Sequence, residues 1–182
     1  HLSLRRQRQM CIRDRRYIAV SLGAEILTAQ KICKNKKLAT IELESKIDSG
    51  VAMDKFSKMI SLMGGPSNFG QNFTRYLPEA AAVLEVCSPH AGYLAQWDGQ
   101  SLGNIVVNLG GGRLVETGQI DHAVGFSDIV RIGTKLAKGS PILKIHAARI
   151  DHAESARIQV LKALKISDAI PKETDLVLKR IS

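Results

Sequence analysis

A glycine cluster is the one place where this sequence resembles a ligand-binding loop. Gly110, Gly111 and Gly112 precede Arg113, but the cluster lacks the G-x-x-x-x-G-K-[ST] pattern of a P-loop and the G-x-G-x-x-G pattern of a dinucleotide site. Phosphate-binding loops lead from a strand into a helix N-terminus, whereas here a helical pattern (SLGNIVVNL) precedes the glycines and a strand pattern (RLVETG) follows them. We therefore predict a structural loop whose left-handed glycine backbone ends the helix, with Arg113 donating to its last carbonyl groups or to Asp121.

The histidines and carboxylates do not form a pattern typical of catalysis or of metal binding. His146 and His152 are six residues apart, and no Cys or carboxylate completes a set at zinc-like spacing. Asp121–His122 and Asp151–His152 could be acid–base pairs, but a turn carboxylate and a helix cap explain the two aspartates equally well. The GFSD segment lacks the second glycine of a nucleophile elbow. We therefore predict that the sequence contains no catalytic residue and no metal ligand.

Composition narrows the function classes further. Of the 182 residues, 45% are hydrophobic and 24% are charged, which allows a packed core and excludes wholesale disorder. No apolar run approaches the roughly 18 residues of a membrane helix, so we expect no membrane partner. Aromatic residues make up only 4%, which is few for a surface that stacks on single-stranded nucleic acid. The three cysteines, Cys11, Cys33 and Cys87, lack C-x-x-C spacing, which favours reduced thiols in a cytoplasmic protein.

The positive charge is concentrated at the N-terminus. Residues 1–16 contain six arginines and one aspartate, and they therefore carry more than half of the net charge of +9. This stretch has neither helical nor strand periodicity and resembles translated adapter or vector sequence, so we interpret it as a tail outside the fold. A functional basic arm is the alternative interpretation. Because the rest of the chain carries little excess charge, we expect no nucleic-acid partner.

Residues 17–78 have the pattern of a helical segment. Apolar residues at helical spacing predict helices in SLGAEILTAQKICK, LATIELESKID and VAMDKFSKMISLM, followed by a polar connector over residues 64–78. Two apolar stripes are expected to face a core. The stripe of the first helix consists of Leu22, Ile26, Ala29 and Cys33. The stripe of the third helix consists of Met53, Phe56, Ile60 and Met63.

Residues 79–182 alternate between short strands and two helices. The predicted strands are AAVLEVCS, YLAQWD, RLVETG, IDHAVGF, IVRIG, ILKIHA and the terminal DLVLKRI. The predicted helices are SLGNIVVNL and DHAESARIQVLKALKIS, the second with Asp151 as its cap and Glu154 completing a capping box. Its inward-facing residues are predicted to be Ala153, Ala156, Val160 and Leu164. The predicted fold class is therefore α+β, with N-terminal helices followed by a compact, hammerhead-like domain of short, mostly antiparallel strands with two helices.

Several separated elements agree in order and spacing with one known family. The segments SPHAGYLAQWDGQSLG, VVNLGGGR, IDHAVGFSDIVRIG and GSPILKIHA resemble the C-terminal domain of thymidine phosphorylase and its pyrimidine-nucleoside phosphorylase relatives. The resemblance extends upstream through VSLGAEILTAQK, MDKFSKMI and FTRYLP and downstream to LVLKRIS, so it covers about Val20 to Ser182. It implies that the chain is part of an α/β phosphorylase, with residues 17–78 a helical remnant of the large domain and residues 79–182 its C-terminal domain.

The resemblance also implies an activity, although not one for this chain alone. Family members are homodimeric pentosyltransferases that attack C1′ of thymidine, uridine or deoxyuridine with inorganic phosphate as co-substrate and without a cofactor. Their K-H-S-T-G-G-type phosphate loop and their S-G-R-G-L…T-G-G-T-x-D signature do not occur here. No residue therefore inherits a catalytic, phosphate-binding or pyrimidine-binding role, and we expect the chain alone to be inactive. A basic-armed nucleic-acid-binding or carrier-like module without catalysis is the alternative.

Overall fold

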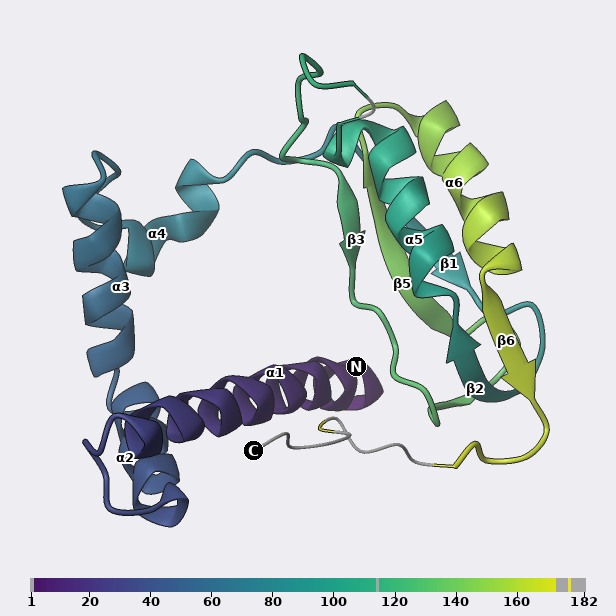
Figure 1. The fold of residues 1–182 in the computed structure, drawn as a ribbon. Helices are drawn as coiled ribbons and strands as arrows, with labels where there is room; N and C mark the ends of the chain where they lie inside the picture. Colours follow the sequence, from purple (N-terminus) through teal and green to yellow (C-terminus); the bar gives the residue numbers. More distant parts are fainter. Residues whose placement is uncertain (1, 114, 173–176, 178–182) are drawn as a thin grey trace. The chain divides into compact units, whose positions relative to one another are not determined.

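The computed structural model describes residues 2–113, 115–172 and 177, with side chains from Asp14 onward. Contacts divide the described chain into two compact units, a helical unit over residues 9–77 and a C-terminal unit over residues 78–172 (Figure 1). Helices together with small antiparallel sheets confirm the predicted α+β class. None of the helices in the described ranges is both long and apolar enough to cross a membrane.

The helical unit follows the predicted order of helices and adds one. Its elements are α1 (Leu2–Ala29), α2 (Lys36–Asp48), α3 (Val51–Leu62) and α4 (Phe69–Tyr76). α4 lies within the stretch predicted to be a polar connector. Its two ends are joined because the Tyr76 hydroxyl donates to Asn68 Oδ1 at 2.7 Å and the Tyr76 ring stacks on Phe69. These contacts join the ends of an eight-residue helix, kinked at Asn72, whose aromatic residues Phe69, Phe73 and Tyr76 recur at helical spacing.

α1 begins well before the predicted position. The structure places residues 2–16 in the helix, so the prediction that this stretch has no regular structure is wrong. Leu, Arg, Gln and Met all have high helix propensities, and neither glycine nor proline occurs before Gly23. A helix can therefore form here without an apolar stripe, which is the signal on which the prediction depended.

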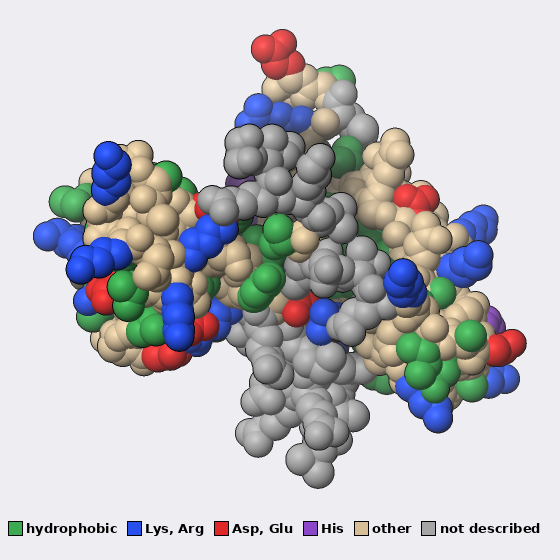
Figure 2. Space-filling model, turned by 60° about the horizontal axis from the view of Figure 1, so that its bottom comes forward, with side chains coloured by type: hydrophobic (Ala, Val, Ile, Leu, Met, Phe, Trp, Pro, Cys, Tyr) green, Lys and Arg blue, Asp and Glu red, His purple; other side chains and the backbone are tan. Residues whose placement is uncertain are grey.

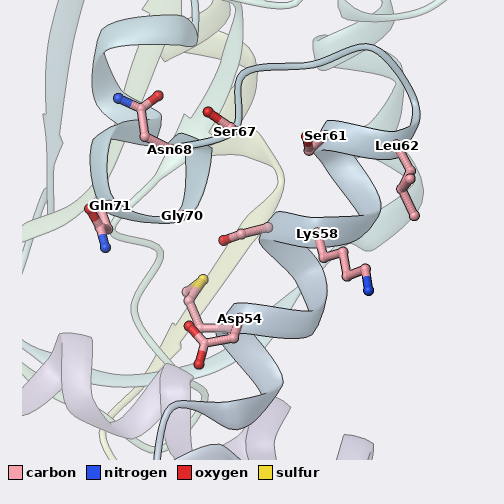
Figure 3. A pocket seen from close by; sticks show the side chains of 10 residues that line it. Asp54, Lys58, Ser61, Leu62, Ser67, Asn68, Gly70 and Gln71 are labelled. Carbon is pink, nitrogen blue, oxygen red and sulfur yellow. The ribbon is translucent and has the colours of Figure 1, made fainter.

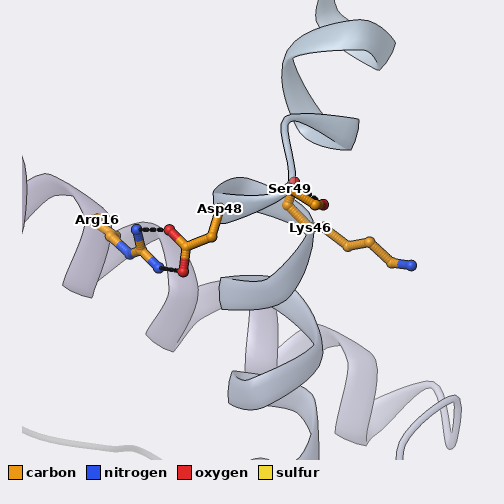
Figure 4. A network of polar contacts seen from close by, with 4 residues as sticks. All are labelled: Arg16, Lys46, Asp48 and Ser49. Atoms are coloured by element: carbon orange, nitrogen blue, oxygen red, sulfur yellow. Dashed lines mark hydrogen bonds and ion pairs between the residues drawn. The ribbon is translucent and has the colours of Figure 1, made fainter.

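α1 and α2 are held together by the ion pairs Arg16–Asp48 and Lys36–Glu25 and by a contact of the Leu43 side chain with Gly23. The Arg16 guanidinium donates to both carboxylate oxygens of Asp48, at 2.5 and 2.7 Å (Figure 4). That hydrogen bonding holds the pKa of Asp48 below its ordinary value of 3.8. Further along, a Cβ on Gly23 would lie 2.9 Å from Leu43 Cδ1, so glycine allows the two helices to approach at this point. Asn35 caps α2, its side chain accepting from the Leu38 N–H at 3.0 Å.

The two predicted apolar stripes do not face a core in this chain. In α1, Leu22 and Ile26 are 59% and 62% exposed, and α3 has no buried side chain. The buried side chains of the helical unit, among those described, are Val20, Ala24 and Ala39. Neither stripe is therefore covered within this chain, because helical periodicity locates an apolar face without showing what covers it.

Two three-stranded antiparallel sheets form the C-terminal unit. In the first sheet, β5 (Pro141–Ala147) lies between β1 (Ala82–Cys87) and β3 (Gly125–Ser127). In the second sheet, β2 (Gly92–Trp97) lies between β4 (Lys135–Leu136) and β6 (Leu164–Ser167). The helical segments are α5 (Gly99–Val106), the π-helical turn η1 (Val107–Gly111) and α6 (Ile150–Lys162).

The core of the C-terminal unit gathers around β5. Ile142, Leu143 and Ile145 of this strand are completely or almost completely buried. α6 packs against β5 and β1, and the predicted inward positions Ala153, Ala156 and Val160 are confirmed as buried. The loop before β4 is also attached to the core, since the Trp97 indole N–H donates to the Val130 carbonyl at 2.9 Å.

The start and end of α6 differ from the prediction. Asp151 does not cap the helix: Arg149 occupies the cap position and binds both Asp151 carboxylate oxygens, at 3.0 and 2.9 Å. Glu154 pairs with Arg157 at 2.8 Å instead of completing a capping box. α6 ends at Lys162, and residues 164–167 form β6 because they pair with β2. Tertiary pairing thus overrides the helical pattern of these residues.

Three predicted strands are not seen as strands: two form turns, and the third lies almost entirely outside the described residues. IVRIG forms a turn in which the Thr134 N–H donates to the Arg131 carbonyl, and the neighbouring strand is Lys135–Leu136. The described residues of RLVETG form a turn closed by the Gly118 N–H and the Val115 carbonyl at 3.0 Å. DLVLKRI lies, apart from Val177, outside the described residues.

Truncation of the central strand tests the position of the core. Ile145→Ala should lower the free energy of unfolding by about 3 kcal/mol, since it leaves a cavity beneath α6. Ile158→Ala on the exposed face of α6 should change it by less than about 0.5 kcal/mol. Urea denaturation followed by far-UV circular dichroism measures both, and equal effects of the two changes would contradict this core.

The Arg16–Asp48 pair makes a pH-dependent prediction. A folded-state pKa below 3.8 means that the Asp48 carboxylate stabilises the fold above pH 3.8 and loses this contribution as the pH falls through its folded pKa. Asp48→Asn should therefore lower the melting temperature slightly at neutral pH, and this difference should shrink as the pH falls below 3.8. At neutral pH the Arg16→Gln variant and the double variant should have the same melting temperature as Asp48→Asn, because each of the three lacks the same ion pair. A difference from the parent chain that persists in acid would contradict the assignment.

Candidate functional site

The glycine loop at the end of α5 was the strongest candidate for a ligand site. Asp98 begins α5, because its carboxylate accepts from the Ser101 N–H at 3.1 Å and from the Ser101 hydroxyl at 2.7 Å. These hydrogen bonds lower the pKa of Asp98 below its ordinary value. The helix then widens into η1 and ends at Gly110, whose φ is 103°. The loop thus receives the C-terminal end of a helix, where unpaired carbonyl groups and the negative end of the dipole disfavour an anion.

The three glycines serve different purposes in this loop. Only Gly110 adopts the left-handed backbone that was predicted for the cluster. Gly111 is needed for space instead, since a Cβ there would lie 2.7 Å from Val106 Cγ1. Gly112 is extended, and a Cβ there would lie 2.6 Å from Val107 Cγ2. The glycines therefore fit a tightly packed helix end.

Arg113 and Asp121 have separate surroundings. The Asp121 N–H donates to the Gly110 carbonyl at 2.9 Å, which returns the chain to the end of the helix. The Asp121 carboxylate accepts from the Ala123 N–H at 2.9 Å. Arg113 is exposed, and no ion pair joins it to Asp121 within the part of the chain that the structure describes. A structural role of Gly110–Arg113 stays a prediction, with Gly110 and Gly111 its best-supported members.

The two Asp–His pairs are not arranged as acid–base pairs. Asp121 bonds to backbone, as described, and His122 is exposed. Asp151 is bound by the Arg149 guanidinium, which lowers the pKa of that carboxyl, while His152 is exposed on α6. Across the described ranges, no group of three or more His, Cys, Asp and Glu side chains is placed to hold a metal ion.

The sequence analysis missed a polar cluster on one face of the first sheet. The Ser127 hydroxyl and His146 Nε2 lie 2.8 Å apart, and Lys144 Nζ lies 3.0 Å from the Asp128 carboxylate. Alternation along β5 places Lys144 and His146 on the same face, and pairing with β3 sets Ser127 opposite Lys144. The sequence signal was this alternation, but the register that brings Ser127 to His146 is not visible without the fold.

This cluster resembles a serine–histidine dyad only in part. A catalytic dyad needs a third group that orients the imidazole through its other nitrogen. The neighbouring carboxylate, Asp128, pairs with Lys144. The two contacts instead attach the three-residue strand β3 to β5, so the cluster is best explained as a clamp on a short edge strand.

A groove of about 540 Å³ lies between α3 and α4 (Figure 3). One face of α3 lines it with Asp54, Lys58 and Ser61, and α4 with the preceding turn adds Asn68 and Gln71. All five side chains are exposed, which is typical of a solvated helix face. Figure 2 likewise shows Lys and Arg side chains interspersed with Asp and Glu on the face that it draws. Neither feature gathers the groups of a catalytic site.

Comparisons with known proteins found one matching family model and a similar curated protein. Residues 93–167 match the family described as the pyrimidine nucleoside phosphorylase C-terminal domain. Over 170 residues the chain is 38% identical to a thymidine phosphorylase of Agrobacterium fabrum (strain C58). This match covers 91% of the chain and 38% of the relative, so the chain spans well under half of the relative's length. The longer match necessarily includes most of the helical unit.

Alanine substitutions separate the roles of the glycines. Gly111→Ala should lower the free energy of unfolding by about 1–3 kcal/mol because its Cβ overpacks against Val106. Gly110→Ala should cost about 1 kcal/mol because its backbone is left-handed. Gly103→Ala is the matched control: no atom lies within 4 Å of its added Cβ, so alanine in this helical position should be neutral or stabilising. Urea denaturation measures the free energy of unfolding of each variant. Equal changes at all three positions would contradict a specialised loop.

Proposed function

Because the chain belongs to the thymidine and pyrimidine-nucleoside phosphorylase family, we propose that it is part of a pentosyltransferase that cleaves a pyrimidine nucleoside with inorganic phosphate. The products are the free base and, from thymidine, 2-deoxyribose 1-phosphate. The observation that carries the proposal is the 170-residue match at 38% identity, which extends through both units. The family match to residues 93–167 supports it independently of the helical unit.

The chemistry of this reaction explains why we assign no catalytic residue to this chain. Phosphorolysis needs cations and backbone N–H groups that hold phosphate, and donors that stabilise charge on the departing pyrimidine. In the C-terminal unit the candidate groups have other partners: Lys144 binds Asp128, Arg149 binds Asp151, and Ser127 contacts His146. The glycine loop presents a helix C-terminus. We therefore propose that the catalytic groups lie in the part of the family protein that this chain does not match.

The contribution of this chain is then architectural. Its C-terminal unit has its own core around β5, and its helical unit presents apolar faces. We propose that it completes a cytoplasmic, homodimeric enzyme that uses phosphate as a co-substrate and no cofactor. Thymidine, uridine and deoxyuridine are the candidate substrates, and an assay of the complete enzyme with each of them gives the preference.

A reconstitution assay tests the proposal. The purified 182-residue chain should release no thymine from thymidine in the presence of phosphate. A chimaera in which this chain replaces the matched residues of the Agrobacterium fabrum thymidine phosphorylase should release thymine in a phosphate-dependent manner, as measured by chromatography. The relative with its matched residues deleted serves as the negative control.

Two outcomes would contradict the proposal. Phosphate-dependent thymine release by the chain alone, co-eluting with the protein on gel filtration, would show that it has a complete active site. A folded chimaera without activity on any of the three nucleosides would show that this chain does not serve the phosphorolysis of pyrimidine nucleosides.

A further inference from the structure

The helical unit has almost no core of its own. Among its described side chains only Val20, Ala24 and Ala39 are buried, and two of these are alanines. Much larger side chains stay exposed in α3, where Phe56 is 42% and Leu62 is 79% accessible. The helices are stabilised instead by the Asn35 cap of α2, by the Arg16–Asp48 pair and by the contact of Leu43 with Gly23. Apolar area of this extent on one small unit is typical of an interaction surface.

α3 has two sides. Its groove-facing side carries Asp54, Ser57, Lys58 and Ser61, together with the apolar Met53 and Leu62. Its other side carries Phe56, Met59, Ile60 and Met63, which we call the α3 stripe. The aromatic rings extend the apolar surface from the α3 stripe to α4, because the Phe56 and Phe69 ring centroids lie 6.1 Å apart.

We propose that the α3 stripe is a docking surface for the part of the phosphorylase polypeptide that this chain does not match. The chain spans only 38% of its relative, and the match includes most of the helical unit, so most of the relative's length is available as the occupant. This inference rests on the proposed function only in taking the chain as part of such a polypeptide.

The chemistry of the α3 stripe defines the occupant. It offers methionines and a phenylalanine and no charged group, so the surface that covers it is apolar and uncharged. Methionine side chains adapt their shape to the surface that they meet. The charged side of α3, with Asp54 and Lys58, stays toward solvent. Helix α3 therefore has one side for the occupant and one for water.

A charge placed in the α3 stripe tests the proposal. Phe56→Glu and the control Ile158→Glu, at an isoleucine 53% exposed on α6, are each made in the isolated chain and in the chimaera described above. In the isolated chain both variants should melt within about 1 °C of the parent, because both positions are exposed. In the chimaera, Phe56→Glu should lower the melting temperature by about 5 °C or more and Ile158→Glu should not, because only the first buries a charge. If the chimaera does not fold, the same substitution at the aligned position of the intact relative replaces it.

The outcomes separate the docking surface from its occupant and from the activity. A neutral Phe56→Glu in the chimaera or in the relative would overturn the proposal. So would a dimer of the isolated chain, detected by sedimentation, that Phe56→Glu dissociates while the chimaera is insensitive, because a second copy would then be the occupant. A chimaera that is destabilised by Phe56→Glu yet inactive supports the docking surface and contradicts the proposed function. An active chimaera that tolerates the charge supports the proposed function and contradicts the docking surface.

Discussion

The C-terminal unit depends on one strand that is paired on both sides. β5 bonds to β1 over six paired positions and to β3 over three, and its inward side chains are completely or almost completely buried. Its two edges are therefore satisfied by β1 and β3, which both precede it in the chain. The loop that contains the glycines leads the chain from η1 toward β3 at one edge of β5, and α6 covers β5 and β1.

The two units are stabilised by different physics. In the C-terminal unit, burial of Leu94, Ile145, Val160 and their neighbours supplies the driving force, and polar contacts such as Ser127–His146 refine the position of short strands. In the helical unit, the ion pairs Arg16–Asp48 and Lys36–Glu25 join α1 to α2, and exposed ion pairs of this kind contribute little each. The helical unit therefore needs a surface to pack on, whereas the C-terminal unit has a core of its own.

Local sequence patterns predicted most elements correctly, and the prediction failed where strand pairing between distant residues decides the structure. β1, β2, β5, α2 and α3 lie where alternation or helical spacing placed them, because each repeats its pattern over a full element. Residues 164–167 continue a helical pattern yet form β6, because the exposed edge of β2 is available to them. The side of α1 that would be buried was predicted incorrectly, since Ala24 and Gly23, rather than the larger Leu22 and Ile26, meet α2. The contact between Ser127 and His146 depends on the register of β3, which no local pattern encodes.

The indole of Trp97 has a use beyond its hydrogen bond to Val130. It is the only tryptophan of the sequence, and it lies in the strand at the centre of the second sheet. Its emission is therefore an intrinsic optical label for the C-terminal unit alone, silent about the helices that precede residue 78. Circular dichroism, by contrast, sums over every helix of the chain. If the two units unfold as one, the transitions recorded by fluorescence and by circular dichroism coincide. If the helical unit unfolds first, the circular dichroism transition precedes the fluorescence transition.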